Sequence, residues 1–223
     1  MKHIAKIKTD FKEKFGIPRQ SGLIKEAEGK IIFEKEYRDI NALRGLEEFS
    51  HIWLIWEFSE AKREKWSPTV RPPLLGGNKK MGVFATRSPF RPNPIGLSVV
   101  KLERIENTKE YGPVIYVSGV DMLDNTPIYD IKPYLPYADS VPDARAGFTE
   151  FLSERALNVE IEDKLLLKIE EEKREEIINI LKGDPRPSYQ DDGERIYGMS
   201  YKDYEIKFKV NNGIMVVTDI SKK

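Results

Sequence analysis

The hydrophobic pattern of the first 150 residues predicts strands rather than helices. Apolar and polar positions alternate over 2–8, and the segment 51–58 (HIWLIWEF) is almost continuously apolar, as in a strand buried on both faces. A further strand is expected over 114–120. Long segments rich in Pro and Gly, 67–77 and 88–96, separate these strands. Together they favour a barrel or a strongly bent sheet.

The segment 95–105 carries the clearest alternation and one change of phase. Ile95, Leu97 and Val99 predict one buried face, after which the apolar positions shift to Val100 and Leu102. Because a shift of one residue turns a strand's side chains to the other face, we expect a β-bulge at Val99–Val100.

After about Phe151 the pattern becomes that of a small α+β unit, so the sequence predicts domains over 1–150 and 151–223. The dipeptide Asn212-Gly213 is a strong hairpin signal. Gly183 stands where a left-handed helix cap is expected, and Pro185 prevents continuation of the helix. The elements predicted here are a strand over 157–161, a helix over Asp163–Lys182 and a hairpin over 205–220.

Composition excludes several classes of chemistry. The chain has no Cys and two His, so disulfides, thiolate zinc sites, iron–sulfur clusters, a Cys nucleophile and a multi-histidine metal centre are excluded, and no metal is expected. The N-terminal residues lack the apolar run of a signal peptide, and no stretch is as apolar as a membrane span. We therefore expect a cytoplasmic protein without membrane contact.

Charge is balanced overall but unevenly distributed. Residues 62–104 contain ten Lys and Arg against two Glu, whereas 150–183 contain ten acidic residues against six basic ones. A basic middle region favours a surface for a polyanion. Ordinary solvated charge explains the same counts equally well.

The common nucleotide-binding signatures are missing. None of the fifteen glycines stands two residues from another, so there is no G-x-G fingerprint, and no G-x-x-x-x-G-K-[ST], G-x-S-x-G or H-E-x-x-H appears. A nucleotide-like cofactor must be held by another architecture.

The segment 81–96, MGVFATRSPFRPNPIG, is the first candidate site. Arg87 and Arg91 lie in a loop that three prolines stiffen, and rigidly held guanidinium groups grip carboxylates or phosphates. The loop is therefore a candidate anion or cofactor clamp. A structural proline loop with solvated arginines is the alternative.

The segment 121–137, DMLDNTPIYDIKPYLPY, is the second. Asp121, Asp124, Asp130 and Lys132 gather around short apolar stretches, next to Tyr134. Carboxylates near a Lys exchange protons or hold sugar hydroxyls. A turn at 124–127 and a plain structural ion pair between Asp130 and Lys132 remain the alternatives.

Six motifs follow one another along the chain: PRQ (18–20), RGLEEFSHIW (44–53), RPPLLGGN (71–78), MGVFATRSPFRPNPIG (81–96), DIKPYLPY (130–137) and DPRPSY (184–189). In this order they resemble the TrmO (TsaA-like) family nearly end to end. That resemblance implies a mainly β, overall α+β protein: a single-sheeted β-barrel outside the Rossmann class, with a small C-terminal α+β domain, working as a homodimer. It also implies a methyltransferase that uses S-adenosylmethionine to methylate the exocyclic amine of N6-threonylcarbamoyladenosine at position 37, beside the anticodon of threonine tRNA.

The resemblance also assigns site residues. Arg19 and Arg87 are expected to orient the methionine carboxylate, with Asp124 on the sugar or amine side. Ser59-Glu60 stand where relatives carry His-Gln, and Asn125 stands where they carry Gly; Asn tolerates the left-handed backbone of such a turn. The family's cofactor pocket corresponds here to Pro18, Arg19, Gln20, Ser59, Glu60, Arg87, Leu97, Met122, Leu123, Asp124 and Asn125.

Asp130, Lys132 and Tyr134 are the catalytic candidates, expected to grip the modified base or to take its proton. Two other hypotheses stay open at this point: a barrel of the same class that methylates another substrate, and a non-catalytic RNA- or nucleotide-binding barrel.

Overall fold

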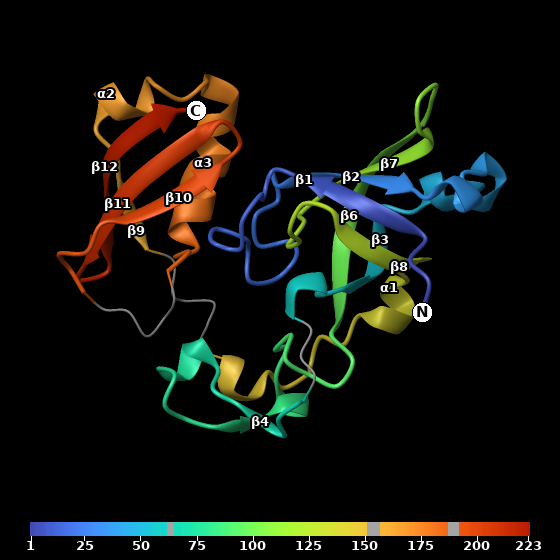
Figure 1. Cartoon of the computed structure of the whole chain (residues 1–223), viewed down its shortest axis with the longest axis horizontal. Coiled ribbons are helices and arrows are strands. Elements are labelled where there is room, and N and C mark those ends of the chain that lie inside the picture. Colours follow the sequence, from blue (N-terminus) through green and yellow to red (C-terminus); the bar gives the residue numbers. More distant parts are fainter. Residues whose placement is uncertain (62–64, 151–156, 187–191) are drawn as a thin grey trace.

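Strands from the first 133 residues close into an antiparallel barrel, as the sequence predicts (Figure 1). The computed structural model describes residues 1–61, 65–150, 157–186 and 192–223. Within them, the barrel runs in the order β1 (Ala5–Thr9), β2 (Glu28–Phe33), β7 (Gly112–Ser118), β6 (Ile95–Thr108), β3 (His51–Glu57) and β8 (Thr126–Pro133), which returns to β1.

The barrel interior is filled by every second side chain of its strands. On β3 the inward residues Ile52, Leu54 and Trp56 are almost fully buried. The outward residues Trp53 and Ile55 are half-buried, so the expectation that this strand is buried on both faces was wrong for its outer face. That outer face is a partly covered apolar surface.

The first half of strand β6 lies in the opposite phase from the one predicted, whereas Val100 and Leu102 face inward as predicted. Its inward residues are Gly96, Ser98, Val100 and Leu102, and the bulge expected at Val99–Val100 is wrong, since the register with β7 shifts between Leu102 and Arg104 instead. The physical reason lies in the neighbouring strand. The large ring of Trp56 occupies the interior at this level, and only Gly and Ser leave room for it.

Short elements connect the barrel strands. Between β2 and β3 run η1 (Lys35–Tyr37), η2 (Ile40–Leu43) and η3 (Leu46–Glu48). The connection from β3 to β6 is long and carries a small two-stranded sheet apart from the barrel (Figure 1). Its elements are η4 (Ser59–Ala61), β4 (Thr69–Val70), η5 (Pro73–Leu75), β5 (Met81–Gly82) and η6 (Val83–Ala85).

In the described residues, the C-terminal part forms a four-stranded sheet accompanied by helices. The sheet has the order β10 (Tyr197–Tyr201), β11 (Tyr204–Asn211), β12 (Ile214–Lys222) and β9 (Asn158–Glu160), and β9 runs parallel to β12. The predicted hairpin is confirmed, since Asn212 and Gly213 both have positive φ. The helical elements after the barrel are α1 (Pro136–Asp139), η7 (Gly147–Thr149), α2 (Asp163–Leu166) and α3 (Glu171–Lys182).

The single helix predicted over Asp163–Lys182 is broken into α2 and α3. At the break, the hydroxyl of Tyr204 accepts the Glu170 backbone N–H at 3.2 Å, and Lys168 donates to the Ile220 carbonyl at 2.7 Å. These contacts with the sheet stabilise the extended backbone of Glu170. The expected left-handed cap at Gly183 was also wrong, because the positive φ falls on Asp184.

The loop after β1 packs against the C-terminal sheet (Figure 1). The rings of Phe11 and Tyr201 lie 5.1 Å apart, and the Glu13 carboxylate accepts the Ser200 backbone N–H at 3.0 Å. The predicted domain boundary at 150/151 touches residues 151–156, outside those described, and stays a prediction. No helix in the described parts of the chain has the length and apolar character to cross a membrane.

Candidate functional site

The cofactor residues expected from the sequence mostly gather at one end of the barrel. At this end β1 and β3 finish while β6 and β8 begin, because Glu57 pairs with Ile95 and Ile7 pairs with Thr126. The turn 121–125 leads into β8 there, and the Phe58 backbone N–H donates to the Pro94 carbonyl at 2.8 Å. Antiparallel closure thus brings together segments that are far apart in the chain.

The loop over 10–22 links these segments by side-chain contacts. Lys12 pairs with Asp124 at 2.9 Å, and Lys14 pairs with Glu60 at 3.0 Å. The Arg87 guanidinium donates to the side-chain oxygen of Gln20. Glu60, Arg87 and Asp124, predicted for one pocket, therefore all border this loop.

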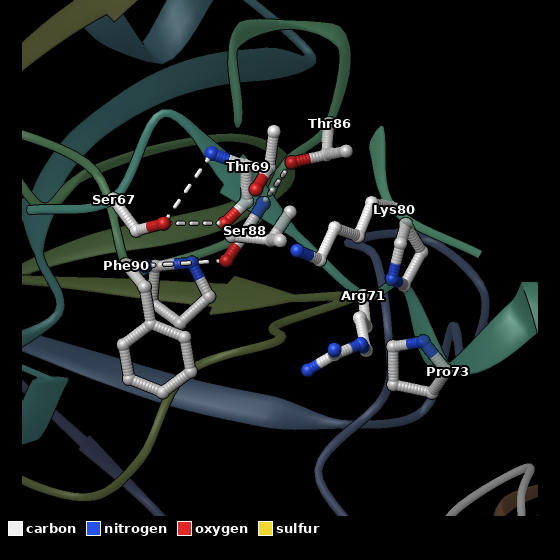
Figure 2. Close-up of a pocket in the computed structure, with 11 residues that line it drawn as sticks. Ser67, Thr69, Arg71, Pro73, Lys80, Thr86, Ser88 and Phe90 are labelled. Atoms are coloured by element: carbon white, nitrogen blue, oxygen red, sulfur yellow. Dashed lines mark hydrogen bonds between the residues drawn. The ribbon is translucent and has the colours of Figure 1, made fainter. Parts of the chain in front are cut away.

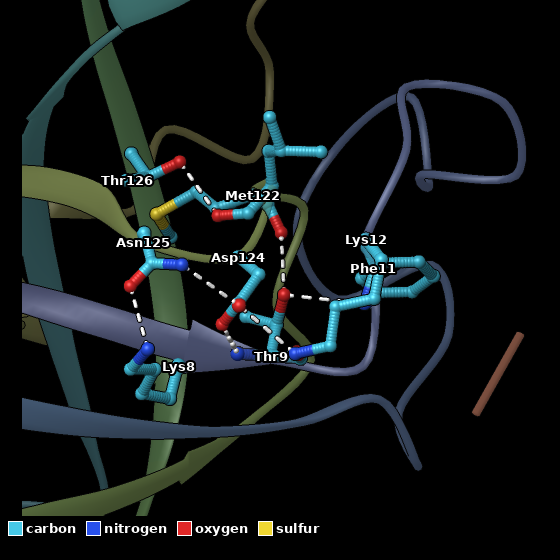
Figure 3. A network of polar contacts seen from close by, with 9 residues as sticks. Lys8, Thr9, Phe11, Lys12, Met122, Asp124, Asn125 and Thr126 are labelled. Atoms are coloured by element: carbon cyan, nitrogen blue, oxygen red, sulfur yellow. Dashed lines mark hydrogen bonds and ion pairs between the residues drawn. The ribbon is translucent and has the colours of Figure 1, made fainter. Parts of the chain in front are cut away.

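Asp124 lies at the centre of a polar network (Figure 3). Its carboxylate accepts the Thr9 backbone N–H at 3.0 Å and the Asn125 side-chain amide at 2.9 Å, besides the ion pair with Lys12. Burial acts to raise the pKa of Asp124, but the bonds from Lys12 and Thr9 outweigh it and lower the pKa below the usual value. The network holds Asp124 charged and fixed in orientation.

The neighbours of Asp124 contribute mainly backbone. Met122 is buried, and its carbonyl accepts the Thr9 hydroxyl at 3.1 Å, while the Leu123 carbonyl accepts the Thr126 hydroxyl at 2.7 Å. Asn125 has φ +65°, so the turn keeps the left-handed backbone expected where relatives carry Gly. Lys8 donates to the Asn125 side chain at 2.6 Å and holds this turn on β1.

Asp121, a half-buried carboxylate, belongs to the second candidate segment but is not among the cofactor or catalytic residues expected from the sequence. The Ser98 hydroxyl donates to it at 2.7 Å, and the Trp56 indole donates to Ser98 at 2.9 Å. Burial raises the pKa of Asp121 to about 6, against the opposing effects of Ser98, of the Ser21 backbone and of the Arg87 charge. Its place in the motif was visible in the sequence, but its hydrogen bond comes from Ser98, which the predicted phase of β6 turned outward.

Arg19 reaches the C-terminal part rather than the barrel end. Its guanidinium donates to the backbone carbonyls of Asp184 at 3.1 Å and Arg186 at 3.2 Å. Arg186 itself is buried and forms two bonds with the Asp184 carboxylate, at 2.9 and 3.0 Å. The neighbouring residues 18–20 thus face both the C-terminal loop, through Arg19, and Arg87, through Gln20.

The two arginines of the proline loop differ in their contacts. Arg91 donates to the backbone carbonyls of Thr86 at 3.1 Å and Ser88 at 3.4 Å, and so braces its own loop. Arg87 leaves the loop and contacts Gln20. Arg91 therefore fits the structural interpretation of this loop, and Arg87 fits the interpretation as an anion or cofactor clamp.

Leu97 and the catalytic candidates lie on the outer face of the barrel. Leu97 of β6 is 56% exposed and lies opposite Ile55 of β3. On its other side, Ile55 lies opposite Asp130 of β8. Lys132 lies opposite Trp53 and forms an ion pair with Asp130 at 3.0 Å.

Tyr134 lies near the far end of β3. Its backbone N–H donates to the His51 carbonyl at 3.0 Å, and its ring lies 5.9 Å from that of Trp53. At about 3.3 Å per residue, Tyr134 is roughly 30 Å along the chain from Asp124. Asp124 therefore precedes the start of β8, and Tyr134 follows its end.

Both parts of the chain match known families. Residues 6–140 match the tRNA-methyltransferase O N-terminal domain, and residues 154–223 match the TrmO C-terminal domain. The tRNA (adenine(37)-N6)-methyltransferase of Escherichia coli is 41% identical over 217 residues, covering 94% of this chain and 92% of the relative. A putative S-adenosylmethionine-dependent methyltransferase of Pseudomonas aeruginosa is 42% identical over 212 residues, covering 91% and 89%.

A solved structure agrees over the whole length. The crystal structure of TrmO from Pseudomonas aeruginosa superposes with a TM-score of 0.78 at 35% identity, covering 99% of this chain and 95% of that one. Motifs, barrel topology and C-terminal sheet all lead to the same assignment: this chain belongs to the TrmO family.

Proposed function

We propose that the protein transfers a methyl group from S-adenosylmethionine to the exocyclic N6 of adenine 37 in tRNA, and that its target is N6-threonylcarbamoyladenosine in threonine tRNA. Membership of the TrmO family supports the reaction, since the relatives named above are a tRNA (adenine(37)-N6)-methyltransferase and an S-adenosylmethionine-dependent methyltransferase. The observation in the structure that best supports it is the contact between Gln20 and Arg87, with the half-buried Asp121 close enough for the Arg87 charge to act on its pKa.

The residues at this end of the barrel fit the cofactor. S-adenosylmethionine supplies a sulfonium-bound methyl group and presents a carboxylate and an ammonium on its methionine part. Arg87 offers a guanidinium for the carboxylate, and Asp121 and Asp124 are carboxylates at the same end. The contact with Gln20 and the ion pair of Asp124 with Lys12 restrict these side chains before a ligand binds. Such preorganisation reduces the entropy lost on binding.

Asp130, Lys132 and Tyr134 remain the proposed groups on the substrate side. The adenine amine is a weak nucleophile, so the chain must align it with the methyl group, exclude water and provide a route for the departing proton. The carboxylate of Asp130 is suited to accept that proton, while Lys132 and Tyr134 offer donors to the threonylcarbamoyl group. Lys132 and Asp130 are paired at 3.0 Å and both remain partly exposed, so they are accessible to a substrate.

A homodimer would reconcile the two halves of the proposed site. Leu97 is exposed and Ile55 and Trp53 are half-buried on the outer face that also carries Asp130 and Lys132. A second copy covering this apolar face would bring its own substrate-side residues toward a cofactor bound near Leu97. Sedimentation of the wild type and of Leu97→Lys tests this: the wild type should be a dimer and the variant should dissociate, whereas a monomeric wild type contradicts it.

Incubation with labelled S-adenosylmethionine and threonylcarbamoylated threonine tRNA, followed by nucleoside analysis, tests the activity. Label on the N6 of the modified adenosine is the expected result. Label only on another RNA or on a small amine favours a different substrate for the same barrel. Cofactor binding without turnover on any tRNA favours a non-catalytic binding protein. The proposed cytoplasmic location is tested separately by cell fractionation.

A further inference from the structure

A cavity of about 530 Å³ lies in the connection between β3 and β6, outside the cofactor residues (Figure 2). Two segments form it: one around the small sheet, from Ser67 to Pro73, and one over 86–90, with Lys80 at its side. Figure 2 shows the side chains of Arg71 and Lys80 directed into the cavity. The family assignment explains none of these residues individually.

The lining combines free positive charge with flat apolar walls. Neither Arg71 nor Lys80 forms an ion pair within the described residues, and both are exposed. Phe90, which is 38% exposed, and prolines form the apolar walls. A site of this composition suits a nucleotide, because the base packs on aromatic and proline surfaces while the cations bind its phosphate. The prolines are Pro72, Pro73 and Pro89.

The lining is held in shape by bonds within the loops. The Ser67 hydroxyl donates to the Thr69 carbonyl at 2.8 Å, and the Thr86 hydroxyl donates to the Val83 carbonyl at 2.8 Å. The Ser88 hydroxyl accepts the Phe90 backbone N–H at 3.2 Å. These bonds set the position of the apolar wall, so a ligand meets a cavity that is already formed.

The cavity and the cofactor residues share one strip of backbone. Thr86 is extended, with φ −134° and ψ 167°, so consecutive side chains leave it on opposite sides. Thr86 and Ser88 line the cavity, whereas Arg87 between them contacts Gln20. An RNA strand can therefore bring its adenosine to the Arg87 side of residues 86–88. A neighbouring nucleotide of the same strand can then enter the cavity on the other side.

We propose that this cavity binds one unpaired nucleotide of the tRNA anticodon loop, flanking the methylated adenosine. Its base packs against Phe90 and the prolines, and its phosphate is bound by Arg71 and Lys80. This inference rests on the proposed tRNA substrate. It adds a specific site at which the protein holds the anticodon loop of that tRNA open. An unpaired strand is required, because a base within a duplex stack cannot enter such a cavity.

The test measures binding of an anticodon stem-loop to R71Q/K80Q, with K35Q/K109Q as a control of equal charge change. Lys35 lies in η1 and Lys109 in the β6–β7 turn, at the far end of β6 from Ile95. R71Q/K80Q should lose about tenfold or more in affinity, and its plot of log K against log salt should flatten by about 0.7 for each lost phosphate contact. Phe90→Ala should lose affinity without a change in that slope, because stacking is uncharged.

Two further measurements make the result decisive. The Kd for S-adenosylmethionine should be the same in R71Q/K80Q and the wild type, and AMP alone should not bind saturably at millimolar concentration. Affinity and salt slope equal to the control variant would overturn the proposal, as would AMP binding that depends on both cations while stem-loop binding does not. Binding needs no turnover, so a wild type that binds the stem-loop through these residues but does not methylate it contradicts the proposed function alone.

Discussion

The indole ring of Trp56 lies directly over the Cα of Gly96 on the neighbouring strand. A Cβ built on Gly96 overlaps three atoms of that ring, all of them part of its rigid bicyclic body. The same ring donates to Ser98 at 2.9 Å, and Ser98 donates to Asp121 at 2.7 Å. Because Gly96 has no side chain, Trp56 can take this position, and through Ser98 it helps to fix the carboxylate of Asp121.

Gly96→Ala should destabilise the protein by about 1–3 kcal/mol, because the added methyl group must displace a ring that has no free space in the barrel. Urea unfolding measures the change. Gly82→Ala is the matched control, since Gly82 has φ −57° and no atom within 4 Å of a built Cβ. Equal midpoints for the two variants would contradict the tight packing described for Trp56.

Asp121→Asn should change how stability depends on pH. The pKa of Asp121 is raised to about 6 from 3.8, so the folded state holds its proton more tightly than the unfolded state. This contribution is fully present below about pH 4 and is lost as the pH rises through about 6. The free energy of unfolding of the wild type relative to the variant should fall over this range, on the order of 1–3 kcal/mol. A flat difference between pH 4 and 7 would count against the desolvation of this carboxyl.

Asp124→Asn should change the pH dependence of stability in the opposite direction from Asp121→Asn. The pKa of Asp124 is lowered, so its contribution to stability is present above the unfolded value of 3.8 and is lost as the pH falls through the folded value. At neutral pH the variant should be less stable by about 1.5–3 kcal/mol, the usual effect of losing charge-assisted bonds. Acid titration of both proteins, followed by circular dichroism, should show the difference shrinking below about pH 4. A difference that grows on acidification contradicts the network.

Arg87→Ala should abolish binding of S-adenosylmethionine without unfolding the protein. The guanidinium is the group proposed to bind the carboxylate of the cofactor, and no apolar side chain replaces it. Calorimetric titration measures the affinity, and the melting temperature reports the fold. Arg104→Ala removes an equal charge from the same region of sequence, where Arg104 pairs with Glu106, and should bind normally. Undiminished affinity in Arg87→Ala would remove this residue from the cofactor site.

Lys132→Ala should separate binding from turnover. Lys132 lies on the outer face opposite Trp53, away from the Asp124 network. We expect cofactor affinity close to that of the wild type and a methylation rate reduced by about 100-fold, typical for loss of a group acting in the transition state. Lys101→Ala, which disrupts an exposed pair with Glu103, is the control. Wild-type turnover in Lys132→Ala would show that the substrate side lies elsewhere.

The sequence predicted the barrel and the confirmed hairpin, because these follow from strand patterns and turn residues. It predicted the family because six ordered motifs resemble it. It failed on the phase of β6, since Ile95, Leu97 and Val99 look like an inner face while the interior at that level is filled by Trp56 of another strand. It also failed on the break between α2 and α3, where Tyr204 and Lys168 hold an extended residue. Both failures come from contacts between segments far apart in the chain, which periodicity does not contain.

The site residues also divide into what local sequence predicts and what contacts between distant segments decide. The motifs identified the side chains, but which of them meet depends on closure of the barrel. Arg19 and Gln20 are adjacent in sequence, yet one contacts Asp184 and the other Arg87. Asp121 was named only as a member of the second candidate segment, and its hydrogen bond from Ser98 needs Ser98 to face inward, opposite to the predicted phase of that part of β6.

The adjacent contacts of Arg19 and Gln20 connect the barrel end physically to the C-terminal loop. A single peptide unit joins Gln20, whose side chain contacts Arg87 at the cofactor end, to Arg19, whose side chain holds the backbone of Asp184 and Arg186. Thermodynamic linkage is reciprocal: if a bound cofactor steadies this segment, amides near Asp184 exchange their hydrogens more slowly, and a loosened C-terminal loop weakens cofactor affinity by the same free energy. In that case the loop around Asp184 and Arg186 supports the cofactor end of the barrel, besides connecting α3 to the C-terminal sheet.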